Sequence, residues 1–142
     1  MLGRTPAVVA ADLGLPLIEL PDTADSLELA LRVMVHHLVA TGEVPPGQEE
    51  EALGAVRRRE QLGATAVGQA LALPHGYSTA VTRTVGLVAA SQPGVVWPGS
   101  DRQAVHTVCL VLLPLGDRGA ARAWSRKLQG FFEDRRAAEA GR

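Results

Sequence analysis

The sequence predicts a layered α/β domain with helices on both faces of a sheet. Segments with helical periodicity alternate with short apolar runs along the chain, a pattern typical of this architecture. The chain has 142 residues, enough for one domain with a substantial core. No internal repeat, linker or low-complexity segment divides it, so we expect a single domain over residues 1–142.

The first expected elements are a strand and a helix. The run LPLIEL at 15–20 predicts a short strand that Pro21 stops. The segment that follows repeats apolar residues at helical spacing, and we expect Gly42 to end this helix. Its candidate N-terminal caps are Asp22, Thr23 and Asp25.

The rest of the chain continues the alternation. PPGQEEEALGAVRRRE (45–60) predicts a helix, because its glutamates come early and its arginines late, as the helix dipole favours. A later helix is expected from Gly119 to about Arg136. We expect strands at 70–73, 85–90 and 105–113, the last of them central, and loops at 62–68 and 92–102.

Composition narrows the class of protein. The formal net charge is −1, so no basic field points to nucleic acid or to a membrane surface. The single cysteine, Cys109, excludes an internal disulfide framework and suits a reducing compartment. No apolar run reaches the length of about 18 residues that marks a membrane span, and the N-terminus lacks the apolar core of a secretory signal. We therefore expect a cytoplasmic protein that neither inserts into a membrane nor binds nucleic acid.

The stretch from Glu60 to Gly76, EQLGATAVGQALALPHG, carries the clearest chemical signal. His75 follows a short apolar run and lies between Pro74 and Gly76. Proline fixes its own φ, and glycine permits backbone conformations and close approaches that other residues resist. We expect the His75 imidazole to leave a strand into a turn, exposed on a rigid support. A neutral imidazole is a competent nucleophile near neutral pH.

This stretch resembles the phosphorylation-site signature of the enzyme IIA domains of the bacterial phosphoenolpyruvate-dependent phosphotransferase system, in the fructose, mannitol and nitrogen-regulatory class. The matching pattern is Glu60, six residues, Val67-Gly68, two residues, and then LALPHG at 71–76. Arg59-Glu60 and the segment LGAT at 62–65 are similar to further segments of these domains. Most of the remaining chain resembles them more weakly.

The resemblance implies a fold, an activity and partners. The implied fold is a three-layer α/β/α sandwich with a mixed β-sheet, like that of phosphotransferase and anion-transport-protein domains. His75 would accept a phosphoryl group from the histidine phosphocarrier HPr or a paralogue. The group would then pass to a sugar-specific IIB domain, or serve as a regulatory mark towards a target protein. Because both partners are phosphohistidines and the transfer is nearly isoenergetic, we expect no metal and no cofactor.

Three further residues are candidate phosphate-stabilising groups. We expect the Arg59 guanidinium, the Thr65 hydroxyl and the backbone N–H groups around Gly76 to contact phosphate oxygens. Structural alternatives stay open for two of them. Arg59 could instead be a charge that complements the helix dipole, and Thr65 could only cap or brace its loop.

Two departures from the family pattern leave a second hypothesis open. These domains usually carry a second histidine near the start of the helix after the last strand, whereas GDRGAARAWSRKL at 116–128 has none. Ala121 or Ala123 stands at that position. The chain also ends at Arg142, where relatives usually continue through another helical stretch, so we expect a shortened C-terminus. The alternative to a phosphocarrier is a regulatory protein-binding module without efficient phosphotransfer.

The other histidines and the cysteine are weaker candidates. His36 and His37 are adjacent on an expected helix, so their side chains diverge by about 100° and do not easily chelate one metal. His106 and Cys109 lie three residues apart on an expected strand and therefore face opposite sides of the sheet. We expect Cys109 to be a core residue.

Overall fold

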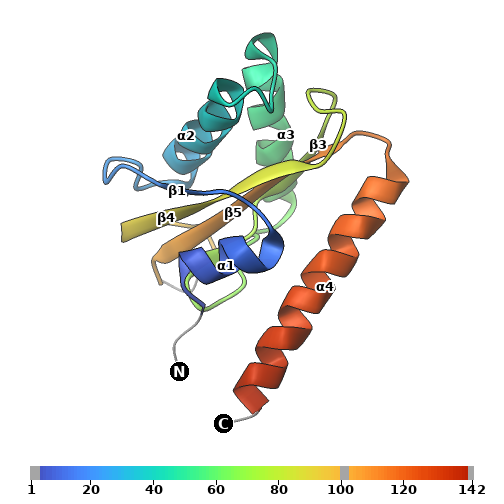
Figure 1. Ribbon diagram of the computed structural model, residues 1–142. Coiled ribbons are helices and arrows are strands. Elements are labelled where there is room, and N and C mark those ends of the chain that lie inside the picture. Colours follow the sequence, from blue (N-terminus) through green and yellow to red (C-terminus); the bar gives the residue numbers. More distant parts are fainter. Residues whose placement is uncertain (1–3, 100–102, 141–142) are drawn as a thin grey trace.

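The strands of the chain form one mixed sheet with helices on both faces (Figure 1). The structure is a computed structural model that describes residues 4–99 and 103–140. Its strands are β1 (Leu17–Glu19), β2 (Leu71–Ala72), β3 (His75–Ser78), β4 (Val85–Val95) and β5 (Val105–Pro114). Its helices are α1 (Pro6–Leu13), α2 (Leu27–Ala40), α3 (Glu49–Leu62) and α4 (Arg118–Ala140), with a 3₁₀ turn η1 (Pro46–Gln48) before α3.

Strand β5 is the centre of the sheet, as the sequence predicts. It pairs antiparallel with β4 on one side, and β4 pairs in parallel with β1. On its other side β5 pairs in parallel with β2 and then with β3. The predicted mixed sheet is therefore confirmed, and β2 and β3 follow each other along the same edge of β5.

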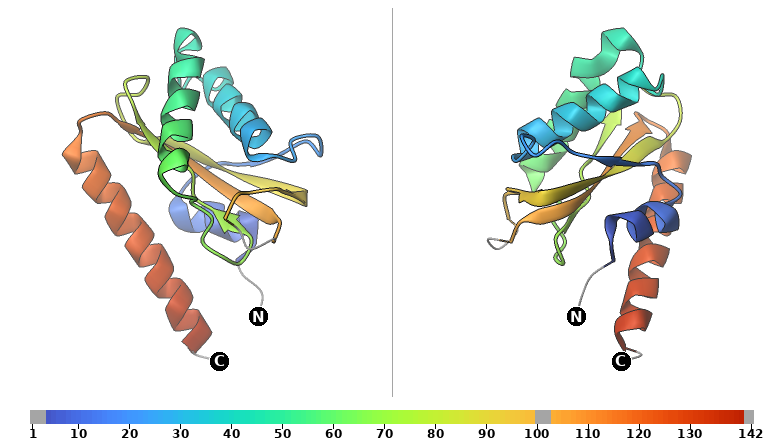
Figure 2. Two further views of the ribbon diagram at one scale, coloured as in Figure 1. Left: turned by 180° about the vertical axis from the view of Figure 1, so that it is seen from behind. Right: turned by 60° about the vertical axis from the view of Figure 1, so that its left-hand side comes forward.

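Alternate side chains of β5 belong to two separate cores, one on each face of the sheet. Helices α2 and α3 cover one face, and α1 and α4 lie on the other (Figure 2). Leu110 and its even-numbered neighbours pack with α2 and α3, whereas Cys109 and its odd-numbered neighbours pack with α1 and α4. Trp124 and Phe131 contribute the buried face of α4. Burial raises the pKa of the Cys109 thiol to about 12, so the thiol stays protonated and acts as the predicted core residue.

Helix α2 begins later than the candidate caps suggested. Its N-cap is Ser26, which is extended and whose hydroxyl accepts the N–H of Leu29 at 3.3 Å. The predicted caps at 22, 23 and 25 were wrong, because the apolar period begins only after Ser26 and the cap must stand directly before it. The predicted stop is confirmed, since Gly42 has a φ of 82° and donates its N–H to the carbonyl of Val39.

Helices α2 and α3 are joined by a bidentate ion pair. Arg57 on α3 donates two hydrogen bonds to the Glu28 carboxylate on α2, Nε at 2.6 Å and Nη2 at 2.9 Å. The hydrogen bonds from Arg57 are the main cause that lowers the pKa of Glu28. The first of the three arginines at 57–59 is therefore a structural residue that aligns the two helices.

Three elements differ from the sequence-based expectation. Helix α1 was not predicted, although Thr5 caps it, Pro6 occupies its first turn and Gly14 ends it with a φ of 67°. Strand β4 continues to Val95 rather than ending at 90, with an irregular register after Ala90. Residues 92–95 of the expected loop thus belong to β4, and 100–102 lie outside the described residues. Helix α4 continues to Ala140, four residues past its expected end.

No helix in the described part of the chain has the length and apolar character needed to cross a bilayer.

Gly76 is the point of closest contact between β3 and α3. A Cβ atom built at residue 76 would lie 2.7 Å from the carbonyl carbon of Ala55 and 2.8 Å from the nitrogen of Val56. Both atoms are helix backbone and cannot yield as a side chain can. Glycine is therefore required at 76 because a helix backbone approaches it.

We predict that Gly76→Ala destabilises the fold by about 1–3 kcal/mol, the usual cost of overpacking a core. The measurement is urea unfolding followed by circular dichroism. Gly130→Ala is the matched control, because Gly130 lies in α4 with nothing within 4 Å of an added Cβ. A helical glycine replaced by alanine should gain roughly 0.5–1 kcal/mol. Equal unfolding midpoints for Gly76→Ala and the parent would contradict the close contact.

Candidate functional site

His75 is the first residue of β3 and stands on the edge of the sheet. It pairs with Val111 on β5, and its side chain is half-buried. The expectation that His75 leaves a strand into a turn was wrong. Strand β2 ends at Ala72, and the chain starts a new strand at His75, because β5 is long enough to pair with both segments in succession. The imidazole is therefore fixed by a strand.

One ring nitrogen of His75 is held by the backbone. Nδ1 lies 3.0 Å from the carbonyl oxygen of Leu73. A carbonyl oxygen only accepts hydrogen bonds, so Nδ1 carries the proton and donates it. In the neutral ring the lone pair then belongs to Nε2, the nitrogen on the far side of the ring. The backbone thus selects Nε2 as the nucleophilic atom.

The carboxylate of Glu60, at the end of α3, organises the loop that leads to His75. It accepts the N–H of Thr65 at 2.9 Å, the Thr65 hydroxyl at 2.7 Å and the indole N–H of Trp97 at 3.2 Å. The Thr65 carbonyl in turn accepts the N–H of Leu73 at 3.0 Å. Glu60, Thr65, Leu73 and His75 therefore form a continuous relay of hydrogen bonds from α3 to the imidazole.

The relay gives Thr65 a structural role. Thr65 is buried, and its hydroxyl donates its proton to Glu60. Of the two alternatives that the sequence left open, this contact favours the brace. Arg59 donates a hydrogen bond from Nη1 to the carbonyl of Gly63 at 2.9 Å, which ties the end of α3 to the same loop. A contact of Arg59 or Thr65 with phosphate stays a prediction.

The backbone donors around Gly76 face two different ways. Val111 donates its N–H to the carbonyl of Pro74 at 3.1 Å, so this part of the parallel ladder directs the Gly76 N–H towards β5. Along an edge strand the neighbouring groups face away from the sheet. Of the N–H groups around Gly76, those of His75 and Tyr77 therefore face outward and that of Gly76 faces β5, and a contact of these groups with phosphate stays a prediction.

The loop before β2 carries unusual backbone conformations. Gln69 and Ala70 are non-glycine residues with positive φ, 53° and 62°. The Ala70 carbonyl accepts the N–H groups of His106 and Thr107 at 2.9 and 3.1 Å, which holds this conformation against the start of β5. Strained backbone of this kind gathers at functional sites. No residue pattern predicts it, because neither residue is a glycine or an asparagine.

Two of the other histidines, His36 and His106, have partners away from His75. His106 donates Nδ1–H to the carbonyl of Ser91 at 2.8 Å, on the face opposite to Cys109. His36 lies 3.1 Å from the Glu49 carboxylate on the surface. Within residues 4–99 and 103–140, no three His, Cys, Asp or Glu side chains gather in a way that could hold a metal ion.

The chain matches a family model over residues 15–135. That family is described as phosphoenolpyruvate-dependent sugar phosphotransferase system, EIIA 2. The match includes β1 through most of α4, and with them the loop, the relay and His75.

Two relatives are similar in sequence. One is the 2-O-alpha-mannosyl-D-glycerate-specific EIIABC component of the PTS system from Escherichia coli, 37% identical over 95 residues, which are 66% of this chain and 14% of that protein. The other is a nitrogen regulatory protein from Bradyrhizobium diazoefficiens, 36% identical over 83 residues, 58% of this chain and 54% of that protein. The matched part thus spans about half of one relative and a small part of the other.

Solved structures share the fold. Nitrogen regulatory protein IIA-Ntr from Neisseria meningitidis superposes with a TM-score of 0.68 at 20% identity, covering 89% of this chain and 84% of that one. Mannitol IIA from Escherichia coli gives a TM-score of 0.59 at 26% identity, covering 75% and 74%. A complex of enzyme IIA mannitol with phosphorylated enzyme IIB mannitol gives 0.59 at 24% identity, covering 76% and 74%.

We predict that Glu60→Gln destabilises the protein by about 1–3 kcal/mol, because an amide NH₂ would face one of the three donors that the carboxylate now accepts. Urea unfolding measures the loss, and limited proteolysis should cut the loop at 63–70 faster. The matched control is Glu50→Gln on the same helix, whose side chain is 71% exposed and 3.5 Å from Arg32. The control should stay within about 0.5 kcal/mol of the parent. Equal effects of the two variants would refute the relay.

Proposed function

This chain belongs to the EIIA 2 family of the phosphoenolpyruvate-dependent sugar phosphotransferase system, and from that premise we propose that it is a cytoplasmic phosphocarrier that accepts a phosphoryl group on His75. The donor is a phosphorylated histidine of an HPr-like carrier. The acceptor is a IIB domain, or else the phosphoryl group remains on His75 and changes the binding of a regulatory target. The hydrogen bond from His75 Nδ1 to the Leu73 carbonyl is the observation that carries the proposal.

That hydrogen bond supports attack by Nε2. The Nε2 lone pair forms a bond to phosphorus while the bond between phosphorus and the donor's ring nitrogen breaks, and the electron pair of the broken bond returns to the donor imidazole. His75 keeps its Nδ1 proton and becomes a positively charged phosphoimidazolium. The Leu73 carbonyl then stabilises this charge, because a hydrogen bond from a charged donor is stronger than one from a neutral donor.

Phosphoryl transfer depends more on positioning and charge stabilisation than on covalent help. The relay from Glu60 through Thr65 and Leu73 supplies the positioning of the ring. The outward N–H groups of His75 and Tyr77 are donors beside the nucleophile for phosphate oxygens. Arg59, about one helical turn beyond the α3 segment that touches Gly76, is the candidate on α3 for a cationic contact.

The second candidate function is a regulatory protein-binding module of the same fold that lacks efficient phosphotransfer. It is favoured by the first turns of α4, which carry Ala121 and Ala123 and no histidine in residues 116–128. The two candidates differ in what His75 does. In the binding module, partner affinity is the same for the parent and for His75→Ala, whereas a phosphocarrier loses its phosphorylation-dependent change in affinity with that substitution.

The family match leaves sugar transport and regulation as alternatives for the phosphoryl group. The mannosyl-glycerate relative is described as a sugar-derivative-specific EIIABC component of the PTS system, and the Bradyrhizobium relative as a nitrogen regulatory protein. Sugar specificity depends on IIB and membrane-bound partners, which are separate from the matched segment of this chain.

We predict that incubation with phosphoenolpyruvate, enzyme I and HPr adds one phosphoryl group to the protein, and that His75→Ala abolishes the addition. Intact-mass spectrometry at neutral to basic pH detects the adduct, which should be labile in acid and stable in base. His106→Ala is the matched control and should be phosphorylated like the parent. If the His75→Ala variant still gained the phosphoryl group, another histidine would be the acceptor. No adduct on the folded parent, beside a labelled control IIA, would favour the binding module.

We predict that Arg59→Ala slows phosphoryl transfer by about 10- to 100-fold, the range for losing a charged contact of about 1.5–3 kcal/mol. Quench-flow measurement of phosphorylated protein gives the rate. The control is Arg58→Ala, because Arg58 is exposed and lies 3.7 Å from Glu51. Unfolding curves of both variants separate a lost phosphate contact from a lost brace at Gly63. An unchanged rate for Arg59→Ala would show that Arg59 only ties the loop.

A further inference from the structure

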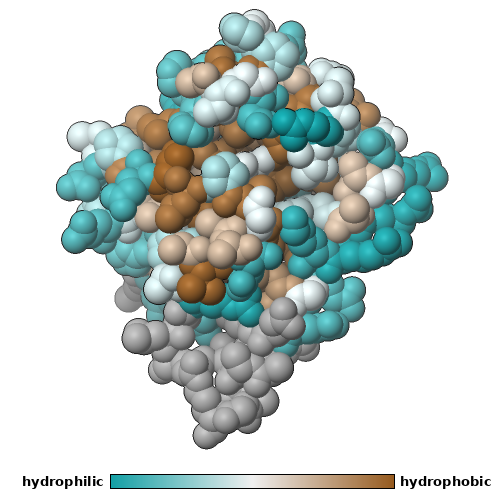
Figure 3. Space-filling view, in the orientation of Figure 1, coloured by the Kyte–Doolittle hydropathy of each residue, from teal (hydrophilic) through white to brown (hydrophobic). Residues whose placement is uncertain are grey.

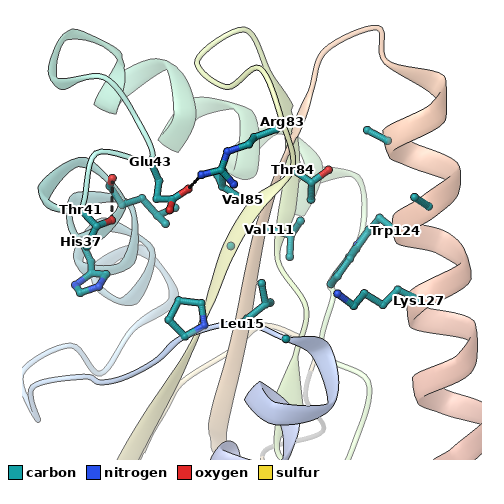
Figure 4. Close-up of a pocket in the computed structure, with 16 residues that line it drawn as sticks. Leu15, His37, Thr41, Glu43, Arg83, Thr84, Val85, Val111, Trp124 and Lys127 are labelled. Carbon is teal, nitrogen blue, oxygen red and sulfur yellow. Dashed lines mark hydrogen bonds and ion pairs between the residues drawn. The ribbon is translucent and has the colours of Figure 1, made fainter.

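A cavity, here called the edge cavity, lies beside the start of β4, where β1 does not yet cover that strand, and His75 is not among the residues that line it (Figure 4). Its volume is about 590 Å³, within the usual range of small-molecule sites. Four segments surround it: the turn between α1 and β1, the end of α2, the start of β4 and the inner side of α4. Nothing in the proposed phosphotransfer uses these residues.

The floor of this edge cavity is apolar. Gly86 of β4 and its partner Val111 of β5 form it, Trp124 of α4 and Leu15 stand beside it, and Val85 borders it at the edge of the sheet. Apolar side chains gather around a hollow at the centre of the same face of the molecule (Figure 3). An apolar body of a ligand would therefore be removed from water here, which is favourable in proportion to the area buried.

The floor also offers main-chain hydrogen-bonding groups. Val88 donates its N–H to the Pro16 carbonyl, and the Ala90 carbonyl accepts the N–H of Leu20, so every second residue of β4 faces β1. By this alternation the N–H and C=O of Gly86 also face that side. Pairing with β1 begins only at Leu17 opposite Val88, and Pro16 has no N–H to give. The donor and the acceptor of Gly86 are therefore open towards the cavity.

Two cations stand at the rim. Arg83 is bonded to Glu43 at 2.7 Å, and this pair closes the wall between β4 and the end of α2. Lys127, the single lysine of the sequence, extends from α4 with its ammonium group towards the cavity (Figure 4). Its Nζ lies 3.6 Å from a Cβ built at Gly14. The ion pairs found within the described part of the chain do not include Lys127, so its charge is available to a ligand.

We propose that the edge cavity binds a small organic anion, an apolar ring or branched chain that carries one acidic group. The apolar body rests on Val111 against Trp124, the acidic group pairs with Lys127, and a polar atom of the ligand meets the backbone of Gly86. An inorganic anion would not cover the apolar floor, which would stay in contact with water. An extended peptide would have to pass over the Arg83–Glu43 wall or over α4, so a compact ligand fits the enclosure better.

The cavity and His75 share one structural element. Val111 forms part of the floor and is also the register partner of His75, and its N–H holds the Pro74 carbonyl. The ligand site does not rest on the phosphotransfer proposal, because its test measures binding alone.

The test uses two probes that differ by one charge. Anilinonaphthalene sulfonate is an aromatic anion that fluoresces in apolar sites, and N-phenylnaphthylamine has the same rings without the sulfonate. We expect the parent protein to bind the anion saturably with one site. Lys127→Ala should weaken the anion about tenfold or more, the loss expected for one charge-assisted contact, and should leave the neutral probe unchanged. Ala123→Trp should weaken both probes, because residue 123 lines the cavity.

Arg126→Ala is the matched control, an exposed neighbour of Lys127 that does not line the cavity. It should bind both probes like the parent. Equal losses for Arg126→Ala and Lys127→Ala would reduce the effect to general surface charge and overturn the proposal. Binding that never saturates, or that is unchanged by Ala123→Trp, would overturn it as well. A dimer seen by sedimentation that the probe dissociates would assign the cavity to a second copy of the chain. Thermal melting of each variant shows that it is folded.

Discussion

The close approach of α3 to β3 at Gly76 is the constraint on which the rest of the site depends. The helix backbone at Ala55 and Val56 lies where a side chain of residue 76 would begin. This contact fixes the distance between the helix and the strand, and the same helix carries Glu60 one turn later. Since His75 is the neighbour of Gly76 on the strand, the contact also fixes the imidazole relative to α3. A larger residue at 76 would therefore change the site as well as the core.

The hydrogen-bond relay orients the His75 imidazole within the space that this contact defines. Glu60 holds Thr65, Thr65 holds Leu73, and the Leu73 carbonyl takes the Nδ1 proton of His75. Each link is short, and two of the four residues, Thr65 and Leu73, use backbone atoms whose positions the fold determines. Without the last link either nitrogen of the ring could carry the proton. With it, one tautomer is favoured and the nucleophilic nitrogen points away from the loop.

The sequence could predict whatever depends on local patterns. The central β5 follows from a long apolar run, and the stop of α2 at Gly42 follows from the freedom of glycine to adopt a positive φ. The N-cap at Ser26 was missed because several capping residues precede it. The full role of Glu60 could not be predicted, because Trp97, 37 residues further along the chain, is brought to it only by the fold. The one indication in the sequence was that Glu60 is the first residue of the motif at 60–76.

Strand β5 gives the edge cavity a mechanical connection to His75. Val111 contributes to the cavity floor, pairs with His75 and donates its N–H to Pro74. Because protein interiors are packed at nearly the density of crystals, a ligand pressed against Val111 does not displace it without also moving its ladder partner. Coupling between the two sites further requires that the ligand bind the phosphorylated and unphosphorylated forms with different affinity. By reciprocity, phosphorylation of His75 would then change the affinity of the cavity by the same factor.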